Sequence, residues 1–256
     1  MYVTDWVMII IMSVINQVVF GQSPGLIKPY IRHNVYRFID DASVSYPSLP
    51  SIVPTWVVGL LITILPTLIF IIVFYYQRST HDLHHALLGL GESIVITMTV
   101  TDIFKILAGR LRPNFLARCL PDAAGDCSQV GSTVRDARLS FPSGHSSMSF
   151  AGMIFLSLYL TGKLRTFSRE GGSLWKALVC LFPMFIAGMV AVSRTLDYHH
   201  NYDDIIAGTL IGCFIGLVCY HLQYPSLFDE KCHKPKNRYH SISASSNKHE
   251  GRLPPL

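Results

Sequence analysis

The chain has 256 residues, of which 50% are apolar and only 14% are charged, whereas about a quarter of the residues in an ordinary soluble protein are charged. This composition excludes an ordinary soluble domain and indicates a membrane protein. The formal net charge of +5 does not indicate a nucleic-acid partner, because the basic residues are scattered beside apolar stretches and form no single exposed field.

Long apolar stretches recur along the chain, and each approaches the roughly 20 residues that a helix needs to cross a bilayer. They cover residues 3–20, 52–76, 83–107, 145–160, 174–192 and 205–222, and the fourth is short. We therefore expect an all-α, polytopic membrane protein with six transmembrane helices within residues 1–224. Both termini then lie on one face of the membrane, and the loops after the first, third and fifth helices lie on the other.

The first stretch is predicted to be a retained helix, because no basic residue precedes it and no clear small-residue cleavage pattern follows it. Its polar residues Asp5, Asn16 and Gln17 are expected near the helix ends, where polar groups cost least. Residues 225–256 are polar and basic, which predicts a disordered tail.

The cysteines fall into three groups. Cys180, Cys213 and Cys219 lie in apolar stretches and are expected to be packing residues. Cys232 follows the last stretch and is a candidate for palmitoylation. Cys119 and Cys127 share the loop CLPDAAGDC; they form a disulfide if this loop faces an oxidising compartment, and two free thiols are the alternative.

The last apolar stretch carries Gly208, Gly212 and Gly216 at four-residue spacing. Small residues at this spacing form a stripe along one side of a helix and let another helix approach closely. We therefore expect this stripe to pack against another helix of the bundle.

The first polar cluster is KILAGRLRP, which ends the third stretch and contains Lys105, Arg110, Arg112 and Pro113. Lys105 and Arg112 are nearly two helical turns apart, but Pro113 disfavours helix at Arg112. Basic residues at the end of a span also reach headgroup phosphates, so this cluster alone does not establish a site.

The second cluster is FPSGHSS, residues 141–147. Ser143 or Ser146 can cap the helix that follows, and Gly144 lets a ligand approach the backbone closely. Free amides at a helix start bind anions, and His145 would stand beside the bound anion with a titratable proton. A capped turn without chemistry is the alternative.

The third cluster is SRTLDYHHNYDDI, residues 193–205. Two histidine–aspartate pairs have the spacing of neighbours on a helix face, His200 with Asp204 and His199 with Asp203. A carboxylate on one imidazole nitrogen fixes the tautomer and leaves the other nitrogen free as a nucleophile. The acidic residues also suit a simple helix start.

Helix parity places all three clusters on one face of the membrane. Cations and amides together make a phosphate cradle, and two histidines offer a nucleophile and an acid. The sequence shows no cluster with convincing metal-ligand spacing, and cations would repel a divalent metal. The combination therefore predicts phosphoryl transfer without a metal or other cofactor.

These motifs resemble the three-part signature of the type 2 phosphatidic acid phosphatase family: Lys105 and Arg112-Pro113, then Pro142-Ser143-Gly144-His145, then Ser193-Arg194, His200 and Asp204. The resemblance implies an acid-phosphatase/vanadium-haloperoxidase-like helical bundle, and it selects His200 and Asp204 over His199 and Asp203. It implies that His200 attacks phosphorus, Asp204 orients it and His145 acts as acid and base. The implied phosphate-binding residues are Lys105, Arg112, Ser143, Gly144 and Arg194.

The flanking residues look most like eukaryotic phosphatases of phosphatidate and diacylglycerol pyrophosphate, so a lipid phosphate is the implied substrate. A polyprenyl diphosphate phosphatase is the alternative enzyme, because the motifs contain phosphate-binding residues and do not specify the lipid tail. A non-catalytic lipid-binding or transport protein is the alternative of another class. If Arg112 and Arg194 serve the chemistry and are left out of the count of basic residues, the positive-inside rule favours cytosolic termini. The site is then luminal or extracellular.

Overall fold

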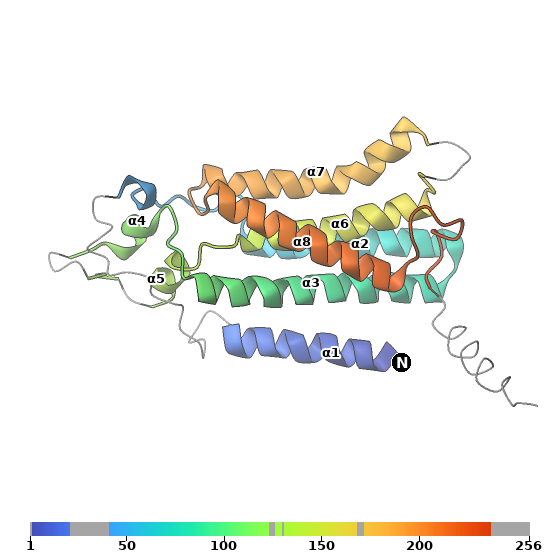
Figure 1. Cartoon of the computed structure of the whole chain (residues 1–256), viewed down its shortest axis with the longest axis horizontal. Coiled ribbons are helices and arrows are strands. Elements are labelled where there is room, and N and C mark those ends of the chain that lie inside the picture. The colour runs from blue at the N-terminus through green and yellow to red at the C-terminus, as the bar shows by residue number, and fades with distance from the viewer. Residues whose placement is uncertain (1, 21–40, 123–125, 130, 168–171, 237–256) are drawn as a thin grey trace, which may run out of the picture.

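The computed structural model describes residues 2–20, 41–122, 126–129, 131–167 and 172–236. Over these ranges the chain is built from helices joined by turns, which confirms the predicted all-α class (Figure 1). In chain order they are α1 (Tyr2–Ile15), the π-helix η1 (Asn16–Phe20), the 3-10 helix η3 (Ala42–Val44), α2 (Thr55–Gln77), α3 (Thr80–Ala108), α4 (Phe115–Cys119), α5 (Ser132–Ala137), α6 (Gly144–Lys163), α7 (Leu174–Leu196) and α8 (Tyr202–Gln223).

Five helical segments in the described ranges are long and apolar enough to cross a membrane: α1 with η1, α2, α3, α7 and α8. They match the first, second, third, fifth and sixth predicted spans. The polar residues Asn16 and Gln17 lie in η1, at the end of the first span, as expected. The chain is therefore an integral membrane protein.

The predicted fourth span corresponds to α6, which is 20 residues long but is not among the helices apolar enough to cross a membrane. It lies at the centre of the bundle against α2, α3, α7 and α8 (Figure 1). Because its neighbours are helices rather than lipid, it can carry polar residues that bond across interfaces, as Ser157 does to the Cys180 carbonyl. Its buried serines are Ser146, Ser147, Ser149 and Ser157. A sixth membrane crossing stays a prediction.

The glycine stripe of α8 packs against α6, as predicted. A Cβ on Gly208 would stand 2.5 Å from the Ser143 carbonyl oxygen, and one on Gly212 would overlap the Ser147 carbonyl oxygen. The two helix backbones are therefore too close for any larger residue in the stripe. This contact fixes the start of α8 beside the start of α6.

One end of the bundle collects the sequence motifs. The C-terminal ends of α3 and α7 and the N-terminal ends of α6 and α8 lie together there, at the left of Figure 1. Short helices α4 and α5 lie at the same end and contact each other. We call this the motif end. The loops after the third and fifth predicted spans therefore meet at one end, as helix parity predicted.

The loop at the motif end contains a disulfide between Cys119 and Cys127. The structure thus shows the bonded state rather than the free thiols that the sequence left open. Cys119 is fully buried beside Val44, Phe115 and Ala137 in a small apolar cluster. This cluster holds α4 against α5, and the disulfide joins the end of α4 to the loop that precedes α5.

The opposite end of the bundle contains a buried ion pair between Lys163 of α6 and Asp82 of α3, at 2.6 Å. The hydroxyl of Tyr224 donates to Asp82 at 3.1 Å, and Lys163 also donates to the His233 carbonyl at 2.7 Å. These bonds fold residues 224–236 back against α3 and α6, although the sequence predicted disorder from residue 225. Residues 237–256 lie outside the described ranges, and the domain limit at residue 224 stays a prediction.

The structure corrects one prediction for the cysteines. Cys232 is buried, and its thiol lies 3.6 Å from the Gly162 carbonyl oxygen. Because the sulfur faces α6, it is not accessible for the palmitoylation that the sequence suggested. The packing role predicted for the span cysteines is confirmed: Cys180 and Cys219 are buried and Cys213 is half-buried.

Candidate active site

The motif residues come from four helix ends and two loops at the motif end. Lys105 lies in the last turn of α3 and Arg112 in the loop after it, while Arg194 lies in the last turn of α7. Ser143 caps α6, and Gly144 and His145 begin that helix. His200 precedes α8, and Asp204 lies in its first turn.

A cavity of about 400 Å³ opens at this end. The motif residues that line it are Lys105, Arg112, Gly144, His145 and His200. Its remaining walls include apolar side chains of α2, α3 and α6, among them Val58, Ile62, Met98 and Met148. Ser143, Arg194 and Asp204 are fully buried behind this lining. The cavity is therefore polar and cationic at one part and apolar at another.

His200 faces Asp204, but through a helix start rather than along a helix face. The sequence suggested that the two share a face, whereas α8 begins at Tyr202 and Asn201 is its N-cap. The Asp204 carboxylate accepts from the Asn201 backbone N–H at 3.0 Å, and Nδ1 of His200 lies 3.7 Å from the same carboxylate oxygen. This arrangement leaves Nε2 of His200 for the cavity.

Two further residues hold the Asp204 carboxylate. The Ser140 hydroxyl donates to it at 2.6 Å, and Arg110 donates to its other oxygen at 2.9 Å. Arg110 also pairs with Asp203. Because Asp204 is fully buried, these bonds fix its orientation toward His200.

His199 has different partners. Its Nδ1 lies 3.0 Å from Asp197, and its Nε2 accepts from Arg118 at 2.8 Å. Since Arg118 can only donate, the lone pair on Nε2 of His199 is already engaged. The structure thus pairs His199 with Asp197, not with Asp203, and both its nitrogens are used.

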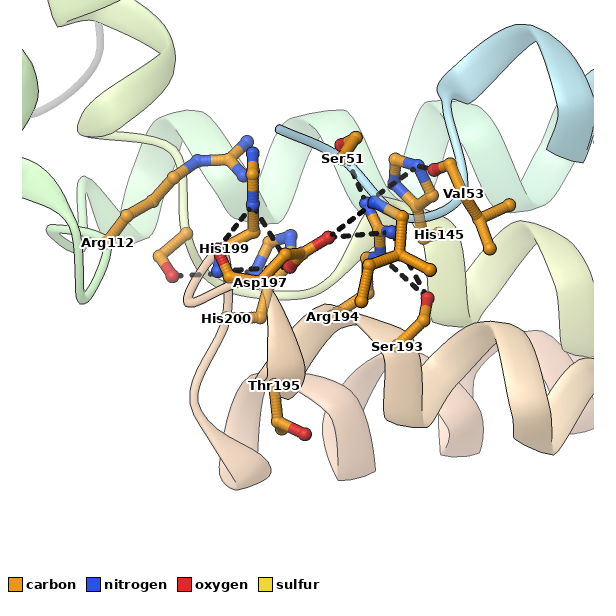
Figure 2. Close-up of polar contacts among 12 residues, drawn as sticks. Ser51, Val53, Arg112, His145, Ser193, Arg194, Thr195, Asp197, His199 and His200 are labelled. Atoms are coloured by element: carbon orange, nitrogen blue, oxygen red, sulfur yellow. Dashed lines mark hydrogen bonds and ion pairs between the residues drawn. The ribbon is translucent and has the colours of Figure 1, made fainter. Parts of the chain in front are cut away.

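Arg194 lies beside His145 (Figure 2). It is fully buried and pairs with Asp197 at 2.8 Å, and one nitrogen lies 3.4 Å from Nε2 of His145. It also donates to Ser51 at 3.0 Å. Asp197 lies outside the sequence motifs, and the structure buries it as the counter-ion of Arg194.

Lys105 and Gly144 lie against each other. A Cβ on Gly144 would stand 3.0 Å from the Lys105 ammonium nitrogen. The absence of a side chain therefore lets this cation approach the start of α6. Ser143, rather than Ser146, is the cap, since its side chain accepts from the Ser146 backbone N–H.

Arg112 is held by a carboxylate that the sequence did not single out. Asp136 accepts from Arg112 at 2.7 Å and from Arg118 at 2.7 Å. Burial alone would raise the pKa of Asp136, but Arg112, Lys105 and Arg118 hold this pKa below its usual value. The ionised Asp136 therefore keeps Arg112 beside the cavity.

Burial and the charges around His200 together decide its protonation state. Burial, the largest cause, and the nearby cations Arg112 and Lys105 lower the pKa of His200 well below its ordinary value. A neutral imidazole keeps a lone pair, which a nucleophile requires. Within the described ranges no group of three or more histidine, cysteine or acidic side chains is arranged to hold a metal ion.

Sequence reasoning missed Ser140, Asp136 and Arg118. Ser140 lies only two residues before Pro142, yet nothing in that spacing points to Asp204. Asp136 and Arg118 come from the loop after the third span, whose conformation depends on long-range packing. Arg110 belongs to the first polar cluster but not to the family motif, and the structure shows its contacts with Asp203 and Asp204.

The fold and the site define a class of protein, a helical membrane protein with a cation-lined cavity and a carboxylate-paired histidine. The chain belongs to the PAP2 superfamily, which matches residues 86–227. All the motif positions from Lys105 to Asp204 lie inside that match, so the family resemblance predicted from the motifs is confirmed.

Curated relatives extend the similarity over most of the chain. A PA-phosphatase related-family protein of Dictyostelium discoideum is 45% identical over 93% of this chain and 85% of its own length. Lipid phosphate phosphatase 1 of Arabidopsis thaliana is 37% identical over 89% of this chain and 69% of its own. Diacylglycerol pyrophosphate phosphatase 1 of Saccharomyces cerevisiae is 31% identical over 90% and 82%. No solved structure matches the chain.

Proposed function

We propose that this protein is an integral-membrane phosphatase that hydrolyses lipid phosphate monoesters or diphosphates. Its substrates would include phosphatidate, which yields diacylglycerol, and diacylglycerol pyrophosphate, which yields phosphatidate. One observation carries the proposal: a neutral histidine, His200, lines the same cavity as the cations Lys105 and Arg112, with the buried Asp204 behind it. The names of the relatives, lipid phosphate phosphatase and diacylglycerol pyrophosphate phosphatase, support a lipid phosphate as substrate.

The first chemical step forms a bond between Nε2 of His200 and phosphorus, while the bond from phosphorus to the leaving oxygen breaks. His145, which the bound phosphate anion favours in its protonated form, donates that proton to the leaving oxygen. In the second step His145 takes a proton from water, whose oxygen attacks phosphorus and releases inorganic phosphate from His200. Asp204 holds the imidazole in one orientation and stabilises its positive charge.

The phosphate oxygens would be bound by Lys105, Arg112 and the Gly144 amide, which all belong to residues lining the cavity. Such fixed donors stabilise the charge that develops in the transition state. Arg194 and Ser143 lie behind the lining, so we assign them to the edge of the phosphate site, where Arg194 also faces His145. Lys105 and Arg112 repel divalent ions at the phosphate site, and the Asp136 carboxylate there is already paired with Arg112 and Arg118, so we propose that no metal takes part.

The disulfide supports a proposal for the membrane orientation. Cys119 and Cys127 are bonded at the motif end, and structural disulfides persist in oxidising compartments. We therefore place the active site on the luminal or extracellular face of an endomembrane or the plasma membrane. By helix parity the termini are then cytosolic.

A substrate panel in mixed micelles tests the proposal. The purified protein should release phosphate from phosphatidate or diacylglycerol pyrophosphate in excess EDTA. His200→Ala should abolish turnover and the acid-labile phosphoenzyme, whereas His199→Ala should retain much of both. Strict dependence on added magnesium, or equal loss in the two variants, would refute the mechanism. If the protein hydrolysed only polyprenyl diphosphates, the substrate class would be polyprenyl diphosphates rather than the proposed lipid phosphates.

A further inference from the structure

The cavity contains a carboxylate that the proposed chemistry does not use. Asp102 lies on α3, three residues before Lys105, and both line the cavity. Residues three apart on a helix are neighbours on one side. The cavity wall therefore presents an anion beside the cation that would bind phosphate.

Both charges are available to a ligand. Across the residues that the structure describes, neither Asp102 nor Lys105 forms a hydrogen bond or an ion pair. Through space, Asp102 interacts with Lys105 and Arg135, and Lys105 interacts with Asp102, Arg112 and Asp136. Asp136, the other carboxylate on the cavity wall, is instead paired with Arg112 and Arg118. An unpaired ionisable group within a membrane protein is costly and marks a functional position.

A phosphate alone would satisfy only one of the two charges. It would pair with Lys105 but would stand as a second anion beside Asp102. A ligand that carries a hydrogen-bond donor near its phosphate would pair with both. Hydroxyl and ammonium groups are the donors that lipid phosphates carry at this position.

We propose that Asp102 is a specificity-determining residue that accepts a hydrogen bond from a hydroxyl or ammonium group close to the substrate phosphate. The inference rests on the proposed phosphatase activity and names the substrates that the same site prefers. They are lipid phosphates with a free donor beside the phosphate. The apolar walls formed by Val58, Ile62, Met98 and Met148 suit the hydrocarbon chain of such a lipid.

The test compares kcat/KM for three lipids in mixed micelles. Phosphatidate has no free donor beside its phosphate, lysophosphatidate has a hydroxyl, and sphingosine 1-phosphate has an ammonium as well. Asp102→Asn removes the charge but still accepts a hydrogen bond, whereas Asp102→Ala removes both. Asp126→Asn is the matched control, because Asp126 is an exposed residue of the motif-end loop outside the cavity.

We expect Asp102→Ala to lower kcat/KM for lysophosphatidate and sphingosine 1-phosphate about 10-fold or more relative to phosphatidate, as expected for loss of a charge-assisted hydrogen bond. If the donor is the ammonium, Asp102→Asn lowers kcat/KM to a similar extent, but for sphingosine 1-phosphate alone. If the donor is the hydroxyl, Asp102→Asn causes only a mild loss of kcat/KM for lysophosphatidate and for sphingosine 1-phosphate. These ratios do not depend on the fraction of folded protein.

Two results would overturn the inference while the proposed function stands. One is a selectivity ratio that stays within about twofold of the wild type in both variants. The other is an equal loss of kcat/KM for all three lipids, which would mean that Asp102 acts only through its effect on Lys105. If the wild-type protein hydrolyses none of the three lipids or of the wider panel, the proposed function itself fails and the inference falls with it.

Discussion

The hydroxyl of Ser140 lies 2.6 Å from the Asp204 carboxylate and 3.5 Å from Nδ1 of His200. The direct distance from Nδ1 to that carboxylate oxygen is longer, 3.7 Å. Ser140 is fully buried, so no solvent competes for its hydroxyl. It therefore joins the imidazole to the carboxylate and acts as a positioning residue for His200.

Ser140→Ala should lower kcat for phosphatidate about 10-fold and leave KM nearly unchanged, because a hydrogen bond to a charged group contributes roughly 1.5–3 kcal/mol. The effect falls on kcat because Ser140 orients the nucleophile and does not line the cavity. Steady-state kinetics in mixed micelles measures the two constants. Ser128→Ala, an exposed serine in the same loop, is the control. A raised KM with an unchanged kcat would contradict this role.

The lowered pKa of His200 predicts a pH-dependent stability. In the folded state burial, Arg112 and Lys105 hold this pKa well below its ordinary value, whereas in the unfolded chain it is about 6.5. Below about pH 6.5 the unfolded state therefore binds more protons, and wild-type stability falls by up to about 1.4 kcal/mol per pH unit. Above that pH the contribution is constant.

Thermal unfolding in detergent measures this effect in wild type and in His200→Ala. Between about pH 7.5 and pH 5.5 the apparent Tm of the wild type should fall more than that of His200→Ala, since only the wild type has the ordinary unfolded-state pKa near 6.5 to titrate at this position. Parallel curves would show that His200 has no depressed pKa.

Hydropathy predicted the spans well because a membrane helix depends on local composition. The predicted stretch 174–192 corresponds to the helix Leu174–Leu196, and the stretch 52–76 corresponds to the helix Thr55–Gln77. Composition could not predict the central place of α6, whose serines are buried against other helices. It also could not predict the burial of Cys232, which depends on the fold of the turn after α8.

The catalytic candidates were predictable because His200, Asp204 and Arg194 lie in one polar stretch between apolar ones. Their partners were not. Ser140 reaches Asp204 across a separation of 64 residues, and only the packing of α6 against α8 brings them together. Spacing alone also misplaced His200 on a helix face, because it ignored Asn201 as the N-cap.

The disulfide predicts a labelling pattern that also bears on orientation. Protein extracted without reductant should show no alkylation at Cys119 or Cys127, and both should become alkylated after reduction and unfolding. Cys180, which is a free thiol, is the internal control, since it should be alkylated after unfolding alone. Mass spectrometry of the peptides measures each site. Alkylation of Cys119 and Cys127 without reductant would argue for a reducing compartment and against a luminal site.

The contact between α6 and α8 predicts opposite effects of two glycine substitutions. Gly212→Ala places a Cβ against the Ser147 carbonyl oxygen and 2.9 Å from the Ala151 backbone nitrogen, and such overpacking costs about 1–3 kcal/mol. In Gly188→Ala the new Cβ has nothing within 4 Å, so the variant should keep or gain up to about 1 kcal/mol through helix propensity. Apparent Tm values in detergent compare them. Because Gly212 faces the start of α6, its variant should also lose phosphatidate turnover, and an equal Tm for both variants would show that the backbones are not in close contact.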